Sequence, residues 1–97
     1  MTTYVVVDND VHNPDEYAKY LALITPTVEQ FGGTYVIRAG EILFADTDWR
    51  PDRMVVIAFA KEENALAWVT SPEVAPIHDM RRANASSKLI VIRGVDE

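Results

Sequence analysis

Short, nearly continuous runs of apolar residues, each bounded by polar positions, set the pattern of this 97-residue chain. Such length and continuity indicate strands buried on both faces rather than helices. We therefore predict strands over Tyr4–Asp8, Arg53–Phe59 and Lys88–Ile92. Thr34–Ala39 is rich in β-branched and aromatic residues and is predicted as a further strand. Glu41–Ala45 is expected to continue it as a short extension or hairpin arm.

Between these strands the apolar residues recur at helical spacing. Asn13 is suited to cap a helix, and Pro14 to occupy its first position. Pro26 is expected to kink this helix or to restart a turn, since proline removes a backbone donor. Three helices are predicted, from Pro14 to the Gly32-Gly33 pair, from near Lys61 through Val69, and from about Val74 to Asn84. Ser86-Ser87 is expected to separate the third helix from the last strand.

The predicted order is strand, helix, strand, strand, helix pair, strand. Right-handed crossovers in two such split units give one antiparallel sheet with helices on one face and the first and third strands at its centre. We therefore predict an α+β fold, a ferredoxin-like split βαβ sandwich formed by a single domain over residues 1–97. The helices cover only one face of this sheet, whereas the apolar strands need cover on both. A homodimer that pairs through the sheet face, as in a dimeric α/β barrel, is therefore expected.

Composition and charge exclude several classes of function. The net charge of −6 argues against a nucleic-acid partner, because phosphate backbones attract clustered Lys and Arg. The absence of cysteine excludes disulfides and Cys-based metal sites. No run is long enough to span a membrane, and no basic leader precedes the first strand, so a cytoplasmic protein is expected. Asp8, Asp10 and His12 lack the later Gly and Glu of a calcium loop, so they are interpreted as a solvated loop, and neither a metal nor a cofactor is expected.

The third helix carries the most informative polar pattern. Val74, Ile77, His78 and Arg81 share one face at helical spacing, and the apolar pair marks that face as inward. A buried guanidinium requires an acceptor. Arg81 therefore forms a structural ion pair, lays its stem over the core with its head in water, or anchors an anionic ligand. In the last case His78 would carry protons, and these two residues are the candidates for catalysis.

Two aromatic residues complete the candidate ligand-binding set of Arg81, His78, Tyr17 and Trp49. Tyr17 is also interpreted as a core or interface aromatic, whose hydroxyl needs one partner. Trp49, beside Arg50 in a loop, is typical of an interface anchor or a pocket lid. Arg38 and Arg53 lie near strand ends, and we expect them to protect strand edges or to pair with nearby acids.

The chain also resembles a known family along nearly its whole length. The matching positions are Asn13-Pro14 with Tyr17 and Tyr20, Phe31-Gly32-Gly33-Thr34-Tyr35, Trp49-Arg50-Pro51, Arg53, Val55-Val56, Phe59, Ala65, Trp68, Ser71-Pro72-Glu73, Arg81, and Leu89-Ile90-Val91 with Gly94. This pattern is similar to domain-of-unknown-function family thirteen-thirty, of the dimeric α/β-barrel superfamily. The resemblance implies a ferredoxin-like subunit whose sheet packs on a partner's sheet, and it implies no particular reaction.

These observations leave two functions open. One is a small dimeric protein that binds a small, anionic molecule between sheet and helices, or a cofactor-independent enzyme acting on such a molecule. The other is a non-catalytic structural or protein-interaction dimer with a filled interior. Space around Arg81 would favour the first, and close packing with a carboxylate partner would favour the second.

Overall fold

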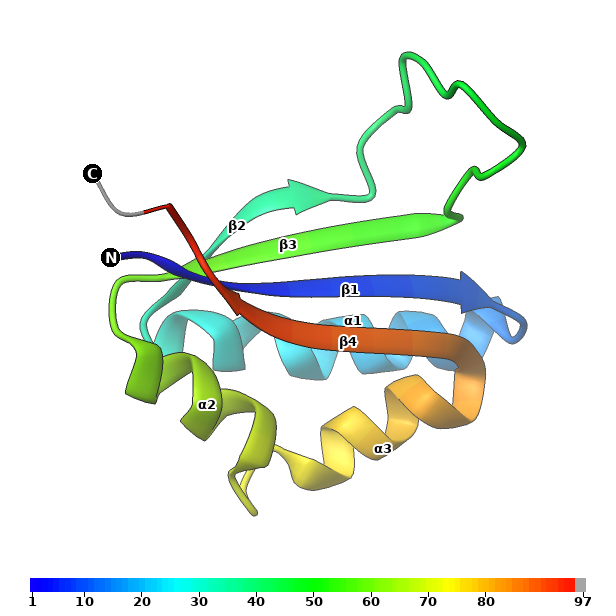
Figure 1. Ribbon diagram of the computed structural model, residues 1–97. Coiled ribbons are helices and arrows are strands. Elements are labelled where there is room, and N and C mark those ends of the chain that lie inside the picture. Colours follow the sequence, from blue (N-terminus) through cyan, green and yellow to red (C-terminus); the bar gives the residue numbers. More distant parts are fainter. Residues whose placement is uncertain (96–97) are drawn as a thin grey trace.

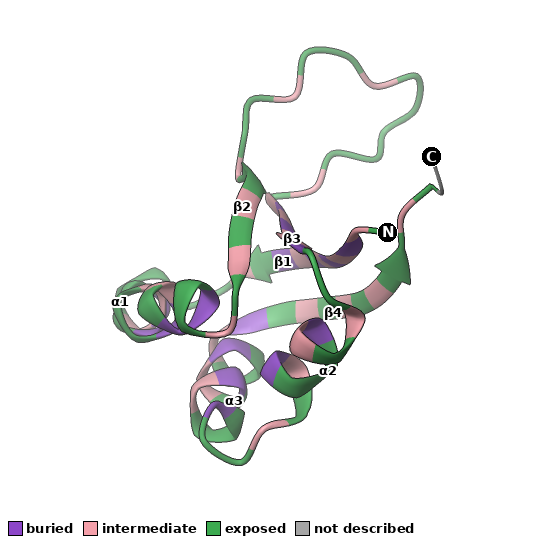
Figure 2. Ribbon diagram, turned by 90° about the vertical axis from the view of Figure 1, so that its left-hand side faces the viewer, coloured by how far each residue is buried: buried purple, intermediate pink, exposed green. Residues whose placement is uncertain are grey.

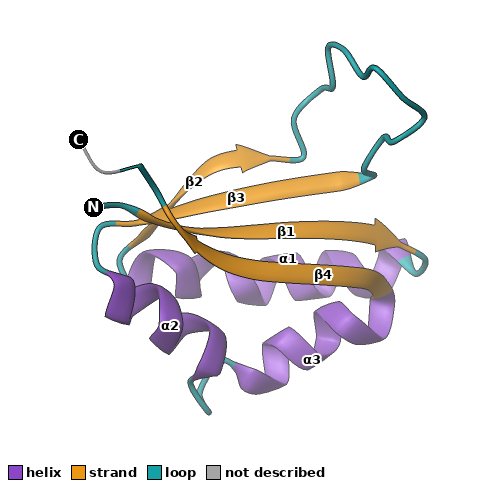
Figure 3. Ribbon diagram, viewed as in Figure 1, coloured by secondary structure: helices purple, strands orange, loops and turns teal. Residues whose placement is uncertain are grey.

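The computed structural model describes residues 1–95 as one sheet covered by helices on one face (Figures 1 and 3). The elements in chain order are β1 (Thr3–Val11), α1 (Pro14–Gln30), β2 (Gly33–Arg38), β3 (Arg53–Phe59), α2 (Glu62–Thr70), α3 (Ala75–Asn84) and β4 (Ala85–Arg93). The strands lie in the order β2-β3-β1-β4, and every neighbouring pair is antiparallel. The predicted ferredoxin-like arrangement, with the first and third strands at the centre, is confirmed.

The sheet alternates between an inner and an outer face. Along β1 the residues Thr3, Val5, Val7 and Asn9 are buried beneath the helices, while the residues between them face outward and are partly exposed. Figure 2 shows buried residues on β1, β3 and the three helices, whereas the loop after β2 is exposed along most of its length. The core therefore lies between the inner face of the sheet and the helices.

The central strand β1 is longer than the sequence suggested, and the additional residues include Asn9. Its apolar run was expected to end at Asp8, with a solvated loop after it, but the strand continues to Val11. The reason is the partner strand: β4 begins at Ala85 and supplies hydrogen bonds to this polar extension. Ser86-Ser87, predicted to separate helix from strand, belongs to β4 and pairs with residues 9 and 10.

Pro26 does not restart α1, which is helical from Pro14 to Gln30. Proline leaves the carbonyl of Ala22 without its usual amide donor. Both residues are exposed, so water can satisfy that carbonyl. The helix ends as predicted: Gly32 has a positive φ of 86° and donates its amide to the Glu29 carbonyl.

The segment between β2 and β3 is a loop over residues 39–52, so the expected extension at Glu41–Ala45 is wrong. Ala39 adopts a positive φ of 54° and donates its amide to the Met54 carbonyl, after which the chain leaves the sheet. Figure 1 shows this loop projecting away from the helices. Leu43, Phe44 and Trp49 are 90%, 79% and 65% exposed there. A hairpin arm would need a facing strand, and none lies beside this segment in the described part of the chain.

Candidate functional site

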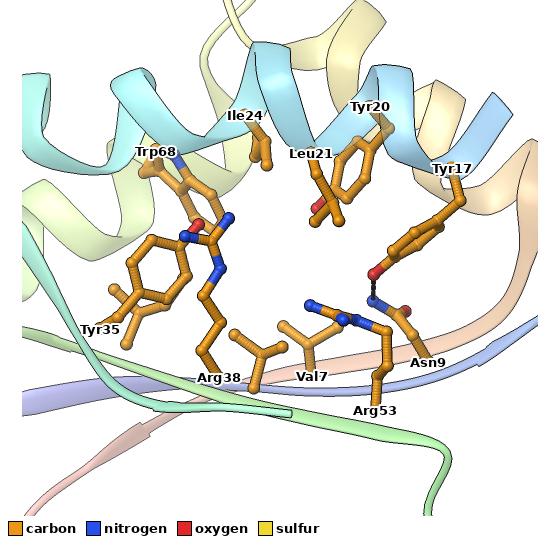
Figure 4. A pocket seen from close by; sticks show the side chains of 12 residues that line it. Val7, Asn9, Tyr17, Tyr20, Leu21, Ile24, Tyr35, Arg38, Arg53 and Trp68 are labelled. Atoms are coloured by element: carbon orange, nitrogen blue, oxygen red, sulfur yellow. Dashed lines mark hydrogen bonds between the residues drawn. The ribbon is translucent and has the colours of Figure 1, made fainter. Parts of the chain in front are cut away.

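A narrow cleft lies between α1 and the inner face of the sheet, with the indole of α2 at one end (Figure 4). Aliphatic and aromatic side chains form most of its walls, and its polar lining consists of an amide, tyrosine hydroxyls and two guanidinium groups. The lining residues are Val7, Asn9, Tyr17, Tyr20, Leu21, Ile24, Tyr35, Arg38, Arg53, Val55, Ile57 and Trp68. The centre of a water molecule can occupy about 20 Å³ of the cleft. This space admits only one or two waters as the side chains stand.

Asn9 and Arg53 meet on the floor of the cleft. They face each other across β1 and β3 in the strand register. Asn9 is 2% exposed, and its Nδ2 donates a hydrogen bond to Tyr17 Oη at 2.8 Å. Its Oδ1 and the Nε of Arg53 are both buried and have no hydrogen-bond partner among the described residues. An unpaired acceptor and an unpaired donor thus come from opposite residues of two neighbouring strands that line one cleft.

Arg53 is further positioned by an aromatic ring. Its guanidinium carbon lies 5.5 Å from the ring centroid of Tyr17, within the range of a cation–π contact. Tyr17 therefore contacts both of the unpaired groups, through its hydroxyl and through its face.

Arg38 enters the cleft because of a bulge in β2. Tyr35 pairs with Ile57 and Ile37 with Val56, so Val36 is an extra residue in the ladder. Because side chains alternate between faces, the extra residue turns Arg38, opposite Val55, to the inner face. Its guanidinium lies 4.3 Å from the Tyr35 ring centroid and donates to Thr25 Oγ1.

No carboxylate within residues 1–95 neutralises the arginines of this cleft. Neither Asp nor Glu is among the lining residues. The ion pairs within the described residues join Lys19 to Glu16, Arg82 to Asp79 and Arg93 to Glu62, all on the surface. The expectation that Arg38 and Arg53 pair with nearby acids is therefore wrong. Although the net charge of the chain is −6, this cleft carries two positively charged side chains with no ion-pair partner among the described residues.

Behind the cleft, α3 contributes a buried polar cluster. His78 and Arg81 are each 3% exposed, which confirms the predicted inward face of this helix. His78 Nε2 lies 3.0 Å from the Trp68 carbonyl, and Arg81 Nη1 lies 2.7 Å from His78 Nδ1. The carbonyl can only accept, so Nε2 carries the proton and Nδ1 accepts from Arg81. Arg81 also donates to Ser87 Oγ at 2.9 Å.

Burial shapes the ionisation of this cluster. The pKa of His78 lies below its ordinary value, chiefly because burial disfavours the charged ring, and the charge of Arg81 lowers it further. Burial also raises the pKa of Tyr20 to about 12, although the charge of Arg81 opposes the rise. His78 and Tyr20 are therefore both neutral near pH 7.

The structure brings only part of the predicted set together. Tyr17 lines the cleft. His78 and Arg81 do not line it, but they lie close behind two residues that do: the His78 ring centroid is 4.6 Å from that of Trp68, and the Arg81 charge acts on Tyr20. Trp49 is on the projecting loop, beside a separate shallow hollow formed with Phe44 and Met54. Arg81 is in none of the ion pairs among the described residues, and its hydrogen bonds join Ser87 and His78.

Sequence reasoning missed the cleft residues Asn9, Arg38 and Arg53 as a group. For Asn9 a signal existed, because it continues the alternation of Val5 and Val7 on the inner face. For Arg38 none existed, since the bulge that turns it inward is not visible in the local sequence. Among residues 1–95, no cluster of three or more His, Asp or Glu side chains is arranged to hold a metal ion.

The antiparallel sheet with three helices on one face defines an α+β protein of ferredoxin-like fold. Within that class the chain matches the domain of unknown function DUF1330 over residues 2–95, and it belongs to this family. The resemblance seen in the sequence is thereby confirmed. No protein with a curated description matches the chain by sequence. In addition, none of the described helices is both long and apolar enough to cross a membrane.

Three solved structures illustrate the fold. A dimeric ferredoxin-like protein of unknown function from Jannaschia is 12% identical, with a TM-score of 0.76 over 97% of this chain and 100% of that one. A Rhodopseudomonas palustris protein of unknown function is 17% identical, with a TM-score of 0.70 over 99% and 84%. SnoaB, a cofactor-independent oxygenase from Streptomyces nogalater, is 18% identical, with a TM-score of 0.66 over 99% and 95%. At these identities the likeness concerns the fold alone.

Proposed function

We propose that this protein is a homodimer that binds a small organic anion in the cleft between α1 and the sheet. The observation that carries the proposal is the pair of unpaired buried atoms, Arg53 Nε and Asn9 Oδ1, in a cleft that has two arginines and no carboxylate. An unpaired buried polar atom costs roughly 1–3 kcal/mol. A protein that retains two such atoms in one cleft has a reason to do so if a ligand satisfies them.

Charge indicates that the ligand is an anion. Arg53 presents a positive charge and a free N–H, while Arg38 is held only by a neutral hydroxyl and an aromatic face. Guanidinium groups bind carboxylates through charge-assisted hydrogen bonds, which are shorter and stronger than neutral ones. The buried charge of Arg81, close behind Tyr20, adds to the positive potential without contacting the ligand. In this proposal Tyr17 touches the ligand, whereas His78 and Arg81 support the wall.

The cleft must widen to admit a ligand larger than water. Arg38 is exposed and Arg53 is half-buried, and both have long, flexible stems. Movement of these two side chains toward solvent would open the cleft without disturbing the buried sheet residues. The narrowness of the unliganded cleft is also the observation that favours the alternative function, a structural dimer whose interior holds only water.

The outer face of the sheet supports the homodimer. Its central side chains are apolar and unpaired with any helix, and they are Tyr4, Val6, Val56, Ala58, Ile90 and Ile92. Ile90 and Ile92 are 55% and 51% exposed in the isolated chain. An apolar surface on the centre of a sheet is typical of an interface. The Jannaschia protein of the same fold is described as dimeric. In this proposal the exposed Trp49 of the projecting loop would contact the second copy.

The proposal is tested by isothermal titration calorimetry on the dimer. The affinity for the anion phenylacetate is compared with that for phenylethanol, a neutral alcohol. The anion should bind, the alcohol should bind at least about tenfold more weakly, and Arg53→Met should remove the difference. The matched control is Arg82→Met, which removes an equal charge from an exposed pair on α3 and should leave binding unchanged. Equal binding of acid and alcohol, or full binding by Arg53→Met, would contradict the proposal and favour the filled interior.

A further inference from the structure

We infer that the anion bound in this cleft is a hydroxy acid. Its carboxylate would accept a hydrogen bond from Arg53, and its hydroxyl would donate one to Asn9. The inference rests on the proposed function and adds the chemical class of the ligand. It follows from what each of the two unpaired atoms can do. Arg53 Nε can only donate, and Asn9 Oδ1 can only accept.

Asn9 determines the need for a donor. Its Nδ2 already donates to Tyr17 Oη, so the atom of this side chain left without a partner among the described residues is the carbonyl oxygen. The side chain is 2% exposed, and its backbone pairs with Arg53 on one side and Ser87 on the other. Asn9 therefore cannot turn to solvent for its missing partner. A carboxylate alone would face Asn9 Oδ1 with an electron pair and would repel it.

The two residues are neighbours in the sheet. Asn9 and Arg53 are directly opposite each other on β1 and β3, and both side chains line the cleft. A 2-hydroxy acid carries its carboxylate and its hydroxyl on adjacent carbon atoms, so one small molecule can offer both an acceptor and a donor. Tyr17, after accepting from Asn9, still has its own hydroxyl hydrogen and can donate it to the same carboxylate. One ligand can thus satisfy all three polar groups.

The remaining walls argue against an inorganic anion such as phosphate. They are formed by residues such as Val7, Ile24, Val55 and Trp68, which offer carbon surface rather than donors. The Trp68 indole N–H is already used by Thr27 Oγ1 at 2.9 Å. Phosphate would leave oxygens unpaired against these walls, whereas the carbon part of a hydroxy acid would pack on them.

The test compares ligands that differ only in the hydrogen-bond donor. Lactate, propionate and 2-methoxypropionate form a small series, and mandelate, phenylacetate and 2-methoxyphenylacetate an aromatic one. Each is titrated into the wild-type protein, with binding followed by calorimetry and by the NMR signals of the Asn9 and Arg53 amides. In at least one series the hydroxy acid should bind about tenfold more tightly than both analogues, which is the value of one well-placed hydrogen bond.

Asn9→Leu should abolish this preference and leave the binding of phenylacetate or propionate in place. Asn13→Leu is the matched control, because Asn13 is exposed and its side chain makes no capping hydrogen bond. If Asn9→Leu does not fold, the comparison of hydroxyl with methoxy ligands on the wild-type protein still decides the question.

The outcomes separate the two proposals. Equal binding of hydroxy, methoxy and unsubstituted acids would overturn the hydroxy-acid inference and leave the anion site intact. Tighter binding of inorganic phosphate than of any organic acid would overturn the inference as well. If no acid in either series binds while the protein is folded, the site itself fails, and the unpaired atoms are bridged by water alone.

Discussion

Arg53 lies in a site where stability and binding should move in opposite directions. Its Nε is buried without a hydrogen-bond partner among the described residues, and its guanidinium carbon lies 5.5 Å from the centroid of the Tyr17 ring. We expect Arg53→Met to stabilise the unliganded protein, because methionine has a similar unbranched stem and no polar atom to bury.

The size of the effect follows from two opposing contributions. Removing the unpaired donor should recover roughly 1–3 kcal/mol. Losing the cation–π contact should cost about 0.5–1 kcal/mol at a partly exposed site. The net gain is therefore about 1 kcal/mol, which for a domain of this size raises the melting temperature by roughly 4–8 °C.

Thermal unfolding followed by circular dichroism, with and without an organic acid, measures both effects. A ligand at roughly ten times its wild-type dissociation constant should stabilise the wild-type protein by about 1.4 kcal/mol, and Arg53→Met, which is expected to bind about tenfold more weakly, by only about 0.4 kcal/mol. All samples need one protein concentration, since the melting temperature of a dimer depends on it. Arg82→Met, which breaks an exposed ion pair with Asp79, should change the stability by less than about 0.5 kcal/mol.

A loss of stability in Arg53→Met larger than that of the control would refute this reasoning. It would mean that Arg53 holds the fold together through its contact with Tyr17, and that the unpaired Nε is met by bound water. The cleft would then be a structural feature, and the case for a ligand would lose its main support.

Other perturbations have equally definite outcomes. Gly33→Ala would place a Cβ 2.8 Å from the ring of Phe59 and should lower the free energy of unfolding, measured by chemical denaturation, by about 1–3 kcal/mol. Gly40→Ala is the control and should have little effect, because the nearest atom to its Cβ would lie 3.9 Å away. The folded-state pKa of His78 lies below its unfolded-state pKa, so the unfolded chain binds the extra proton first as the pH falls. The contribution of neutral His78 to the free energy of unfolding is therefore present above the unfolded-state pKa and is lost as the pH falls toward the folded-state pKa. Urea unfolding should therefore show lower stability at about pH 5 than at about pH 7, with a smaller difference in His78→Gln, and an unchanged difference would contradict this origin. Ile90→Lys places a charge on the outer face of the sheet and should yield a folded monomer in sedimentation analysis. Leu23→Lys on α1 is the control, since Leu23 is 49% exposed and lies outside this face, and it should remain a dimer. A dimeric Ile90→Lys protein would contradict pairing through the sheet face.

Most of the architecture follows from local patterns in the sequence. Apolar runs placed β1, β3 and β4, the Asn13-Pro14 start placed α1, and the Gly32-Gly33 pair ended it within a residue or two. The helical spacing of α3 correctly predicted that His78 and Arg81 are buried. These features are local: each depends on the conformational preferences and burial pattern of neighbouring residues, which can be read along the chain.

The positions of the polar groups in the cleft depend instead on contacts between distant segments. Asn9 is on the inner face because β4 extends β1 past its apolar run, and Arg38 is there because one extra residue in β2 shifts its register against β3. Strand register is set by pairing between segments that are distant in the sequence, and a shift of one residue moves a side chain to the opposite face. For the same reason, the absence of a carboxylate beside Arg38 and Arg53 emerged only when the strands and α1 were brought together.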